Sequence, residues 1–186
     1  MTQPAAVEPI SVTVTQLEMT AAPAHYPPLP LGQNVALLRA HGMPRHFYRY
    51  LMDRVGRQWH WVNVLRLKDE EIDQRLDKPD LNITTLYLDG APAGFFEICP
   101  DGDVSDLHFF GLMPHATGRR IGRWFLGAAV QAAWAPKPRA VTVQTCTLDH
   151  PAALPLYQKL GFVPVAQRQE TIVPLRAEER AEIVMR

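Results

Sequence analysis

A short stretch rich in glycine and arginine has the residue types that bind anionic groups. It runs Thr117-Gly118-Arg119-Arg120-Ile121-Gly122, follows an apolar run at 107–112 and leads into a helical pattern. The first backbone N–H groups of a helix have no internal acceptor, and the helix dipole adds partial positive charge there. Glycine has no Cβ to obstruct a phosphate, and Arg119, Arg120 and Arg123 add full charges. The stretch predicts a phosphate-binding turn. An ordinary strand–loop–helix connection is the alternative, because short motifs often match by chance.

A second segment, residues 150–162, runs His-Pro-Ala-Ala-Leu-Pro-Leu-Tyr-Gln-Lys-Leu-Gly-Phe. In this order the two stretches resemble the GNAT superfamily of acetyl-CoA-dependent N-acyltransferases. There a strand runs into an Arg/Gln-x-x-Gly-x-Gly/Ala turn and a helix, and a segment close to Asn-x-x-Ala-x-x-Leu-Tyr-x-Lys-x-Gly-Phe follows. The resemblance covers residues 80–176 well and the N-terminal part in outline. The sequence departs from the pattern at Thr117 (usually Arg or Gln), Arg120 (usually Gly) and His150 (usually Asn).

The resemblance implies an α/β fold with a mixed, mostly antiparallel central sheet flanked by helices. A splayed parallel strand pair would hold the acyl-CoA, within a single domain over residues 10–186. It also implies acetyl-CoA as co-substrate and no metal. A backbone N–H near Leu112 would polarise the thioester carbonyl, and we expect Gly111 to mark a bulge that permits this. The residues assigned to CoA binding are Phe110, Leu112, Thr117, Gly118, Arg119, Arg120, Ile121, Gly122 and His150.

Two residues take catalytic roles by the same resemblance. Tyr157 matches the tyrosine near the thioester sulfur, where a phenol can protonate the departing thiolate; packing against Leu156 and Leu160 is the alternative. Asp106 stands where some family members place a catalytic glutamate. Its side chain is one methylene shorter, which favours a water relay to the amine. A turn hydrogen bond at the strand end is the alternative role for Asp106.

Other groups compete for these roles. An alkylamine has a pKa of about 10.4 and needs a base at neutral pH. Glu97 and His108 are alternatives to Asp106, and in a regular strand His108 shares a face with Asp106. A satisfied core residue is the commoner role of a lone histidine between apolar residues, and it is the alternative for His108. Cys146 could carry an acyl group if His150 activated it, which requires a lowered thiol pKa; a small buried strand-end residue is the simpler interpretation.

The resemblance thus implies an N-acetyltransferase that transfers acetyl from acetyl-CoA to a primary amine by direct attack in a ternary complex. A non-catalytic acyl-CoA sensor or interaction module is the alternative that Arg120 and His150 keep open. An unrelated nucleotide-phosphate binder is a third hypothesis. The amine acceptor, whether a small molecule or a peptide, is not specified by the sequence, and a homodimer stays open as an assembly.

Composition excludes several partners. The chain has 186 residues, 47% of them hydrophobic and 20% charged, with a formal net charge of zero, as expected of a globular domain. No overall charge draws it to nucleic acid or to an anionic membrane. Cys99 and Cys146 form neither a disulfide framework nor a zinc pattern. With no apolar run of transmembrane length and no signal segment, a cytoplasmic location is expected.

The elements that would position these residues follow from periodicity and turn signals. Expected strands lie at 10–17, 82–89, 93–99, 104–112, 140–145 and 162–173, the last one long or broken. Expected helices lie at 44–57, from 67, at 119–134, at 151–160 and within 175–186. The turns at Asp89-Gly90 and at 100–103 predict an antiparallel meander. The helix 119–134 then crosses to a strand parallel to 104–112.

Four further segments have predictions of their own. Residues 1–9 are expected to be loose. Four prolines between 21 and 31 favour an extended loop, either a connector or a rim of the acceptor pocket. Tyr48, Trp59 and Trp61 lie in a region that forms one wall of the acceptor site in the family, although aromatic residues at such spacing commonly belong to the core. Pro155 requires an irregular start or a bend in its helix.

Overall fold

The computed structural model describes residues 7–185, so the expected looseness of residues 1–9 falls mostly on positions outside the described residues. The strands are β1 (Ile10–Met19), β2 (Val35–Arg39), β3 (Asn82–Leu88), β4 (Ala91–Asp101), β5 (Val104–Leu112), β6 (Ala140–Cys146) and β7 (Val163–Ile172). The helices are α1 (Arg45–Gly56), α2 (Asp69–Leu76), α3 (Gly122–Trp134), α4 (Ala153–Leu160) and α5 (Ala177–Met185), with short 3-10 turns at Arg57–Trp59 and Pro114–Ala116.

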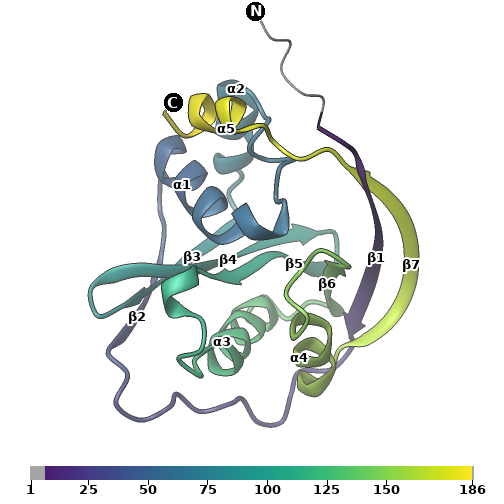
Figure 1. The fold of residues 1–186 in the computed structure, drawn as a ribbon. Helices are drawn as coiled ribbons and strands as arrows, with labels where there is room; N and C mark the ends of the chain where they lie inside the picture. Colours follow the sequence, from purple (N-terminus) through teal and green to yellow (C-terminus); the bar gives the residue numbers. More distant parts are fainter. Residues whose placement is uncertain (1–6, 186) are drawn as a thin grey trace, which may run out of the picture.

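The strands form one seven-stranded sheet in the order β2-β3-β4-β5-β6-β1-β7 (Figure 1). Every neighbouring pair is antiparallel except β5 and β6, which are parallel. This confirms the expected mixed α/β fold, its antiparallel meander of β3, β4 and β5, and its single parallel crossover through α3. The long β1 and β7 curve together around one end of the molecule (Figure 1).

Helices cover both faces of the sheet. Figure 1 shows α1, α2 and α5 on one face and α3 and α4 on the other. The α3 and α4 face has a core built around Phe96, Phe125 and Tyr157, whereas the α1 face has one built around Leu51, Phe95 and Ile72.

Local chemistry explains the turns that set the register. Asp89 and Gly90, with φ of 53° and 85°, form the left-handed pair of a tight hairpin between β3 and β4, as their sequence predicts. At the start of α2, Glu71 accepts the Lys68 backbone N–H at 2.7 Å, and acidic residues fill the first helical turn. Pro155 lies in the first turn of α4, where a missing N–H is tolerated.

Two expectations from the sequence are wrong in detail, and one open alternative is decided. Strand β2 was not expected, because its mostly apolar residues neither alternate nor carry a turn signal. Helix α3 begins at Gly122 rather than at 119, because Arg120 has a φ of 62°, which a right-handed helix does not accept. The final strand is unbroken, as one of the two alternatives had it. Within residues 7–185, no helix has both the length and the apolar composition that a membrane-spanning helix needs.

Candidate functional site

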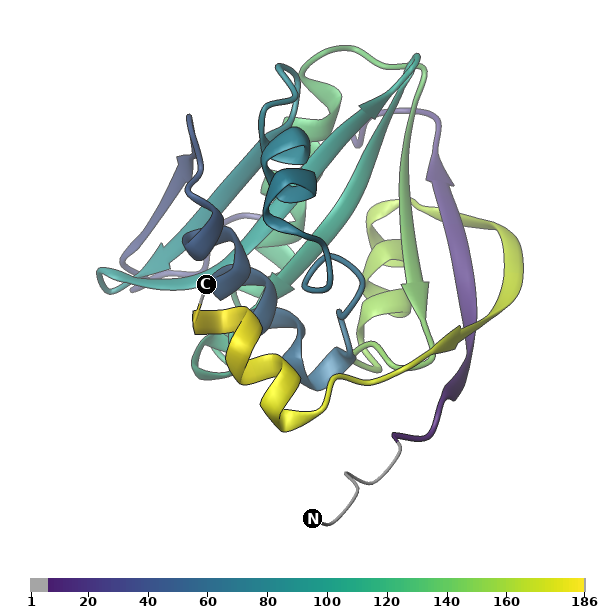
Figure 2. The same cartoon turned by 90° about the horizontal axis from the view of Figure 1, so that it is seen from above.

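A cleft opens where β5 and β6 separate. The two strands pair only from Val104 and Ala140 to Leu107 and Val143, although both continue beyond those residues. Figure 2 shows them close at one end and well apart at the other. A cavity of about 680 Å³ occupies this opening, and its lining includes members of both cores, such as Tyr157 on the α4 side and Trp61 on the α1 side. The cleft therefore passes through the sheet and connects its two faces.

The bulge in β5 lies at His108 and not at Gly111. Phe109 pairs with Glu97 and Leu107 pairs with Ile98, so His108 is the extra residue. Gly111 has a different role. A Cβ at Gly111 would lie 2.4 Å from Val55 Cγ1 and 3.3 Å from the Trp61 ring, so the absent side chain lets α1 and Trp61 pack closely on β5.

The turn after β5 forms an anion cradle at the edge of the cleft. Gly118 has a φ of 77° and open space where a Cβ would be, and Arg120 also has a left-handed backbone. Within residues 7–185, no backbone N–H from 118 to 124 donates a hydrogen bond, and the helix ladder of α3 starts with Phe125 donating to Ile121 at 2.8 Å. These free donors fit a phosphate-bearing ligand such as CoA.

The residues expected to bind CoA do not all face the cleft. Among the described residues that line it are Phe110, Leu112, Thr117, Gly118, Arg120, Gly122 and His150. Arg119 is instead directed to the β3–β4 turn, where its guanidinium lies 3.3 Å from Asp89 Oδ2 and 3.5 Å from Gln33 Oε1. Ile121 is fully buried in the core beneath α3. The Arg119 side chain therefore lies outside the lining, and the buried Ile121 can contact CoA only through its backbone.

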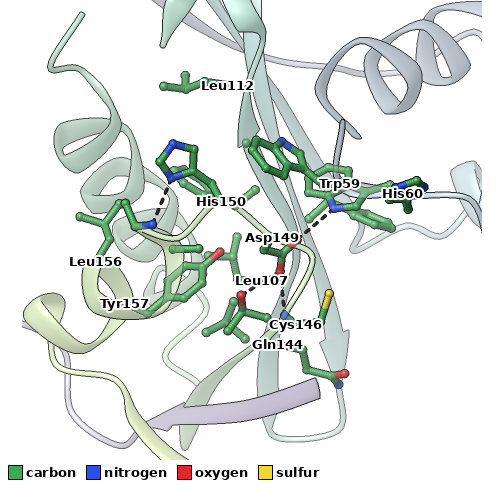
Figure 3. A pocket seen from close by; sticks show the side chains of 18 of the residues that line it. Trp59, His60, Leu107, Leu112, Gln144, Cys146, Asp149, His150, Leu156 and Tyr157 are labelled. Atoms are coloured by element: carbon green, nitrogen blue, oxygen red, sulfur yellow. Dashed lines mark hydrogen bonds between the residues drawn. The ribbon is translucent and has the colours of Figure 1, made fainter. Parts of the chain in front are cut away.

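Tyr157 projects from α4 into the cleft (Figure 3). Its ring is 6% exposed and packs edge-on against Phe162 at 5.9 Å between centroids. Burial, followed by the nearby negative charge of Asp149, raises the pKa of the Tyr157 phenol. The phenol therefore stays protonated at neutral pH and can donate a proton.

Asp106 and His108 form a pair at the edge of the cleft. His108 Nδ1 lies 2.9 Å from Asp106 Oδ2, and Thr142 Oγ1 donates to Asp106 Oδ1 at 2.8 Å. Since a carboxylate only accepts, the imidazole donates from Nδ1 and leaves Nε2 as an acceptor. Of the two, His108 lines the cleft, and Asp106 is not among the described residues that line it. The two candidates are joined, with His108 on the cleft side.

Glu97 is committed to a buried network. Its carboxylate pairs with Arg75 and accepts the Tyr48 hydroxyl at 2.5 Å, and Cys99 Sγ lies 3.4 Å away. Arg75 also donates to the Tyr48 hydroxyl at 2.9 Å and lies over the Phe109 ring. This network ties α1 and α2 to β4. It therefore accounts for Glu97 and Tyr48 as structural residues.

Asp149 is a cleft residue that the sequence analysis missed. Its Oδ2 accepts the Thr145 hydroxyl at 2.8 Å and the Cys146 backbone N–H at 2.9 Å, while Trp61 Nε1 lies 3.5 Å from Oδ1 (Figure 3). In sequence, an Asp just after a strand resembles an ordinary turn residue. Only the fold brings it against Trp61 and Tyr157.

The remaining candidates have defined positions in the cleft. His150 accepts the Ala152 backbone N–H at its Nδ1, and its ring contacts Trp59 edge-on at 5.5 Å between centroids. Cys146 also lines the cleft, but burial and the charge of Asp149 raise its thiol pKa, which disfavours a nucleophilic thiolate. Trp59 and Trp61 both belong to the lining, and Trp61 packs 5.1 Å from Phe109 between centroids.

The family model of the acetyltransferase (GNAT) family matches residues 45–162, well over half of the chain. This chain belongs to the GNAT family. Members of this family are generally acyltransferases, and the matched span contains the turn, the cleft strands and α4.

Solved structures of GNAT proteins share the fold. A GCN5-related N-acetyltransferase from Sphaerobacter thermophilus superposes with a TM-score of 0.59 at 15% identity, covering 91% of this chain and 54% of that one. One from Kribbella flavida gives 0.57 at 14% identity, covering 93% and 62%. An aminoglycoside N-acetyltransferase in complex with CoA gives 0.51 at 18% identity, covering 80% and 97%. The chain spans 64%, 54% and 55% of the first three structural relatives. A search of curated proteins found no match to the sequence.

Proposed function

We propose that this GNAT protein is an acetyl-CoA-dependent N-acetyltransferase that acts on a primary amine in a ternary complex. The observation that carries the proposal is the cleft itself. Free backbone donors of residues 118–124 lie at its edge, and both the buried Tyr157 phenol and the His108 imidazole belong to its lining. Donor, leaving group and acceptor would each meet a group of suitable chemistry.

The donor would lie along the α3 and α4 side. The N–H groups of 118–124 would hold its pyrophosphate, and Arg120 on the lining adds charge. Beyond Leu107, the β5 backbone groups that face β6 have no strand partner within the described residues, so they are free to pair with the pantetheine amides. Phe110 and Leu112 supply apolar contacts beside the turn.

The acceptor would enter from the opposite side and lose a proton to His108 Nε2. Asp106 holds the imidazole in the tautomer that leaves Nε2 free, so it acts as a positioning residue. The neutral amine then attacks the thioester carbonyl carbon. The new C–N bond forms as the C–S bond breaks, and the electron pair leaves with sulfur.

Tyr157 would complete the exchange at the leaving group. Its phenol donates a proton to the thiolate, and the second proton of the attacking nitrogen restores the phenol directly or through water. The raised pKa of Tyr157 keeps this proton in place at neutral pH until the thiolate forms.

The test is amine-dependent release of CoA thiol. The protein is incubated with acetyl-CoA and a panel of primary amines, and free thiol and acetylated amine are both measured. Equal release of the two products supports the proposal. CoA binding without amine-dependent release would instead identify a sensor or interaction module. Displacement of CoA by ATP at comparable concentrations would favour a general nucleotide-phosphate binder.

A further inference from the structure

Asp149 is a cleft carboxylate with no cation beside it. Among the described residues, no Lys, Arg or His nitrogen forms an ion pair with it. By contrast, Glu170, which also lines the cleft, does have a cationic partner, because its Oε1 lies 2.6 Å from Arg168 Nε. A partly buried charge is unfavourable unless a counter-charge accompanies it. A cationic ligand beside Asp149 would therefore be favoured.

The two oxygens of Asp149 differ in what they bind. Oδ2 accepts both short hydrogen bonds, from Thr145 and Cys146, and these hold the carboxylate in place. Among residues 7–185, the only hydrogen-bond partner of Oδ1 is Trp61 Nε1 at 3.5 Å, at the limit of a hydrogen bond. A carboxylate oxygen can accept about two hydrogen bonds, so Oδ1 has unused capacity. Figure 3 shows this carboxylate and the Tyr157 hydroxyl directed toward the same space.

The α1 side of the cleft has apolar and aromatic side chains in its lining, and one of them, Trp61, lies 3.5 Å from Oδ1. Trp61, Phe109, Val62 and Ile172 all line the cleft there. Aromatic ring faces attract a cation, and apolar walls favour an uncharged chain beside it. A carboxylate oxygen beside aromatic and apolar side chains is suited to an ammonium group attached to an apolar substituent.

We propose that Asp149 binds the ammonium group of the acceptor, and that the acceptor class is a primary amine bearing an alkyl or aromatic group and no carboxylate near the nitrogen. This rests on the proposed function. The amine would be captured in its abundant protonated form beside the thioester site and would then release its proton to His108. Thr145 and Cys146 act as positioning residues, because they orient Oδ1 through the other oxygen.

The experiment compares wild type with Asp149→Asn, which keeps the shape of the side chain and its acceptor oxygen for Cys146. With 2-phenylethylamine as acceptor, we expect KM for the amine to rise by about 10-fold to 100-fold, the range for losing a charged hydrogen bond. CoA affinity and melting temperature should change little. Glu170→Gln is the matched control, since Glu170 already has its cation, and its KM should stay within about twofold by the same reasoning. An unchanged KM in Asp149→Asn would leave Asp149 as a structural support alone.

A second measurement needs no variant and no turnover. Calorimetric titration of the CoA-bound wild type with 2-phenylethylamine and with 2-phenylethanol compares a cation with a neutral molecule of similar shape. We expect the amine to bind about 10-fold more tightly or better; equal affinity would overturn the ammonium site even if catalysis is observed.

Phenylalanine should bind less tightly than the amine, because its carboxylate would approach Asp149. Tighter binding of phenylalanine would overturn the proposed acceptor class. Amine binding without turnover would instead refute the proposed function and preserve the site.

Discussion

At the scale of single residues, the proposed proton donor of the cleft, Tyr157, and the proposed proton acceptor, His108, have different environments. Tyr157 is buried and neutral, and His108 is held by Asp106 with one nitrogen free. Asp149 is a third polar group in the lining of the same cleft. Because each group has a different environment, each can be removed with a distinct kinetic consequence.

Tyr157→Phe tests the proton donor. The ring and its packing against Phe162 remain, but the phenolic proton is lost. We expect kcat to fall by about 10²–10⁴-fold, the usual range for a positioned general acid. CoA affinity should hold, as measured by titration, and so should the melting temperature. Full turnover at saturating acceptor would mean that water protonates the thiolate.

His108→Gln tests the proton acceptor. The amide can still approach Asp106, but it cannot take up a proton near neutral pH. We expect kcat/KM for the amine to fall by about 10²–10⁴-fold and most strongly at low pH, where more of the amine is protonated. Asp106→Asn should lower it less, because the imidazole remains. Rate profiles between pH 6 and 9 check this order. A larger loss in Asp106→Asn than in His108→Gln would identify the carboxylate as the base.

At the scale of elements, the turn between β5 and α3 depends on its backbone. Gly118→Val should weaken CoA binding by about 10-fold or more, because a β-branched residue at positive φ distorts the turn that presents the N–H groups. Gly42→Val is the matched control, since Gly42 has a φ of 71° and equal open space but lies outside the lining formed by the described residues. Calorimetric titration with CoA compares the two. Equal affinity in both variants would show that the turn conformation does not matter for binding.

The contact between α1 and β5 is a second element-scale feature. Gly111→Ala places a Cβ 2.4 Å from Val55 Cγ1, so α1 or β5 must shift. We expect a loss of about 1–3 kcal/mol in the free energy of unfolding, the range for overpacking. Gly122→Ala, whose Cβ would meet Leu112 Cδ1 at 3.6 Å, should be close to neutral. Urea denaturation of both variants measures the difference. Equal stability would show that α1 adjusts freely.

The sequence predicted most elements because their signals are local. The Asp89-Gly90 turn, the apolar faces of α1 and α3, and the alternation in β1 each depend on neighbouring residues. Asp149 and the pairing of Arg119 with Asp89 could not be predicted, because they depend on residues far apart in the chain. The bulge was placed at Gly111 because glycine is the usual local signal for one. The register with β4 instead places it at His108.

At the scale of the whole molecule, one sheet separates two hydrophobic cores, and the cleft between β5 and β6 is lined by residues of both. The two sides proposed for the acceptor and the donor are lined by different cores, so we expect that each can change without repacking the other. The network of Glu97, Arg75, Tyr48 and Cys99 fastens the α1 and α2 layer to the sheet. The attachment of α1 and α2 to the sheet therefore depends on buried groups that can titrate.

That dependence predicts a loss of stability in alkali. Burial, followed by the charge of Glu97, raises the pKa of the Cys99 thiol to about 12 from its ordinary value of 9.0. Burial also raises the pKa values of Tyr48 and Tyr157. Above about pH 9 the unfolded chain releases protons that the folded chain retains, so the free energy of unfolding falls as pH rises.

Urea denaturation between pH 7 and 10.5 measures this decline. For Cys99, the stabilisation is fully present below pH 9 and is lost progressively toward pH 12. Cys99→Ser is the informative variant, because its hydroxyl can still donate to Glu97 yet does not titrate in this range. We expect a shallower decline for Cys99→Ser between pH 8.5 and 10.5, even if its stability at pH 7 is lower. Parallel curves for the two proteins would mean that Cys99 ionises equally in the folded and unfolded chains, so the Glu97 network would not exclude the thiolate.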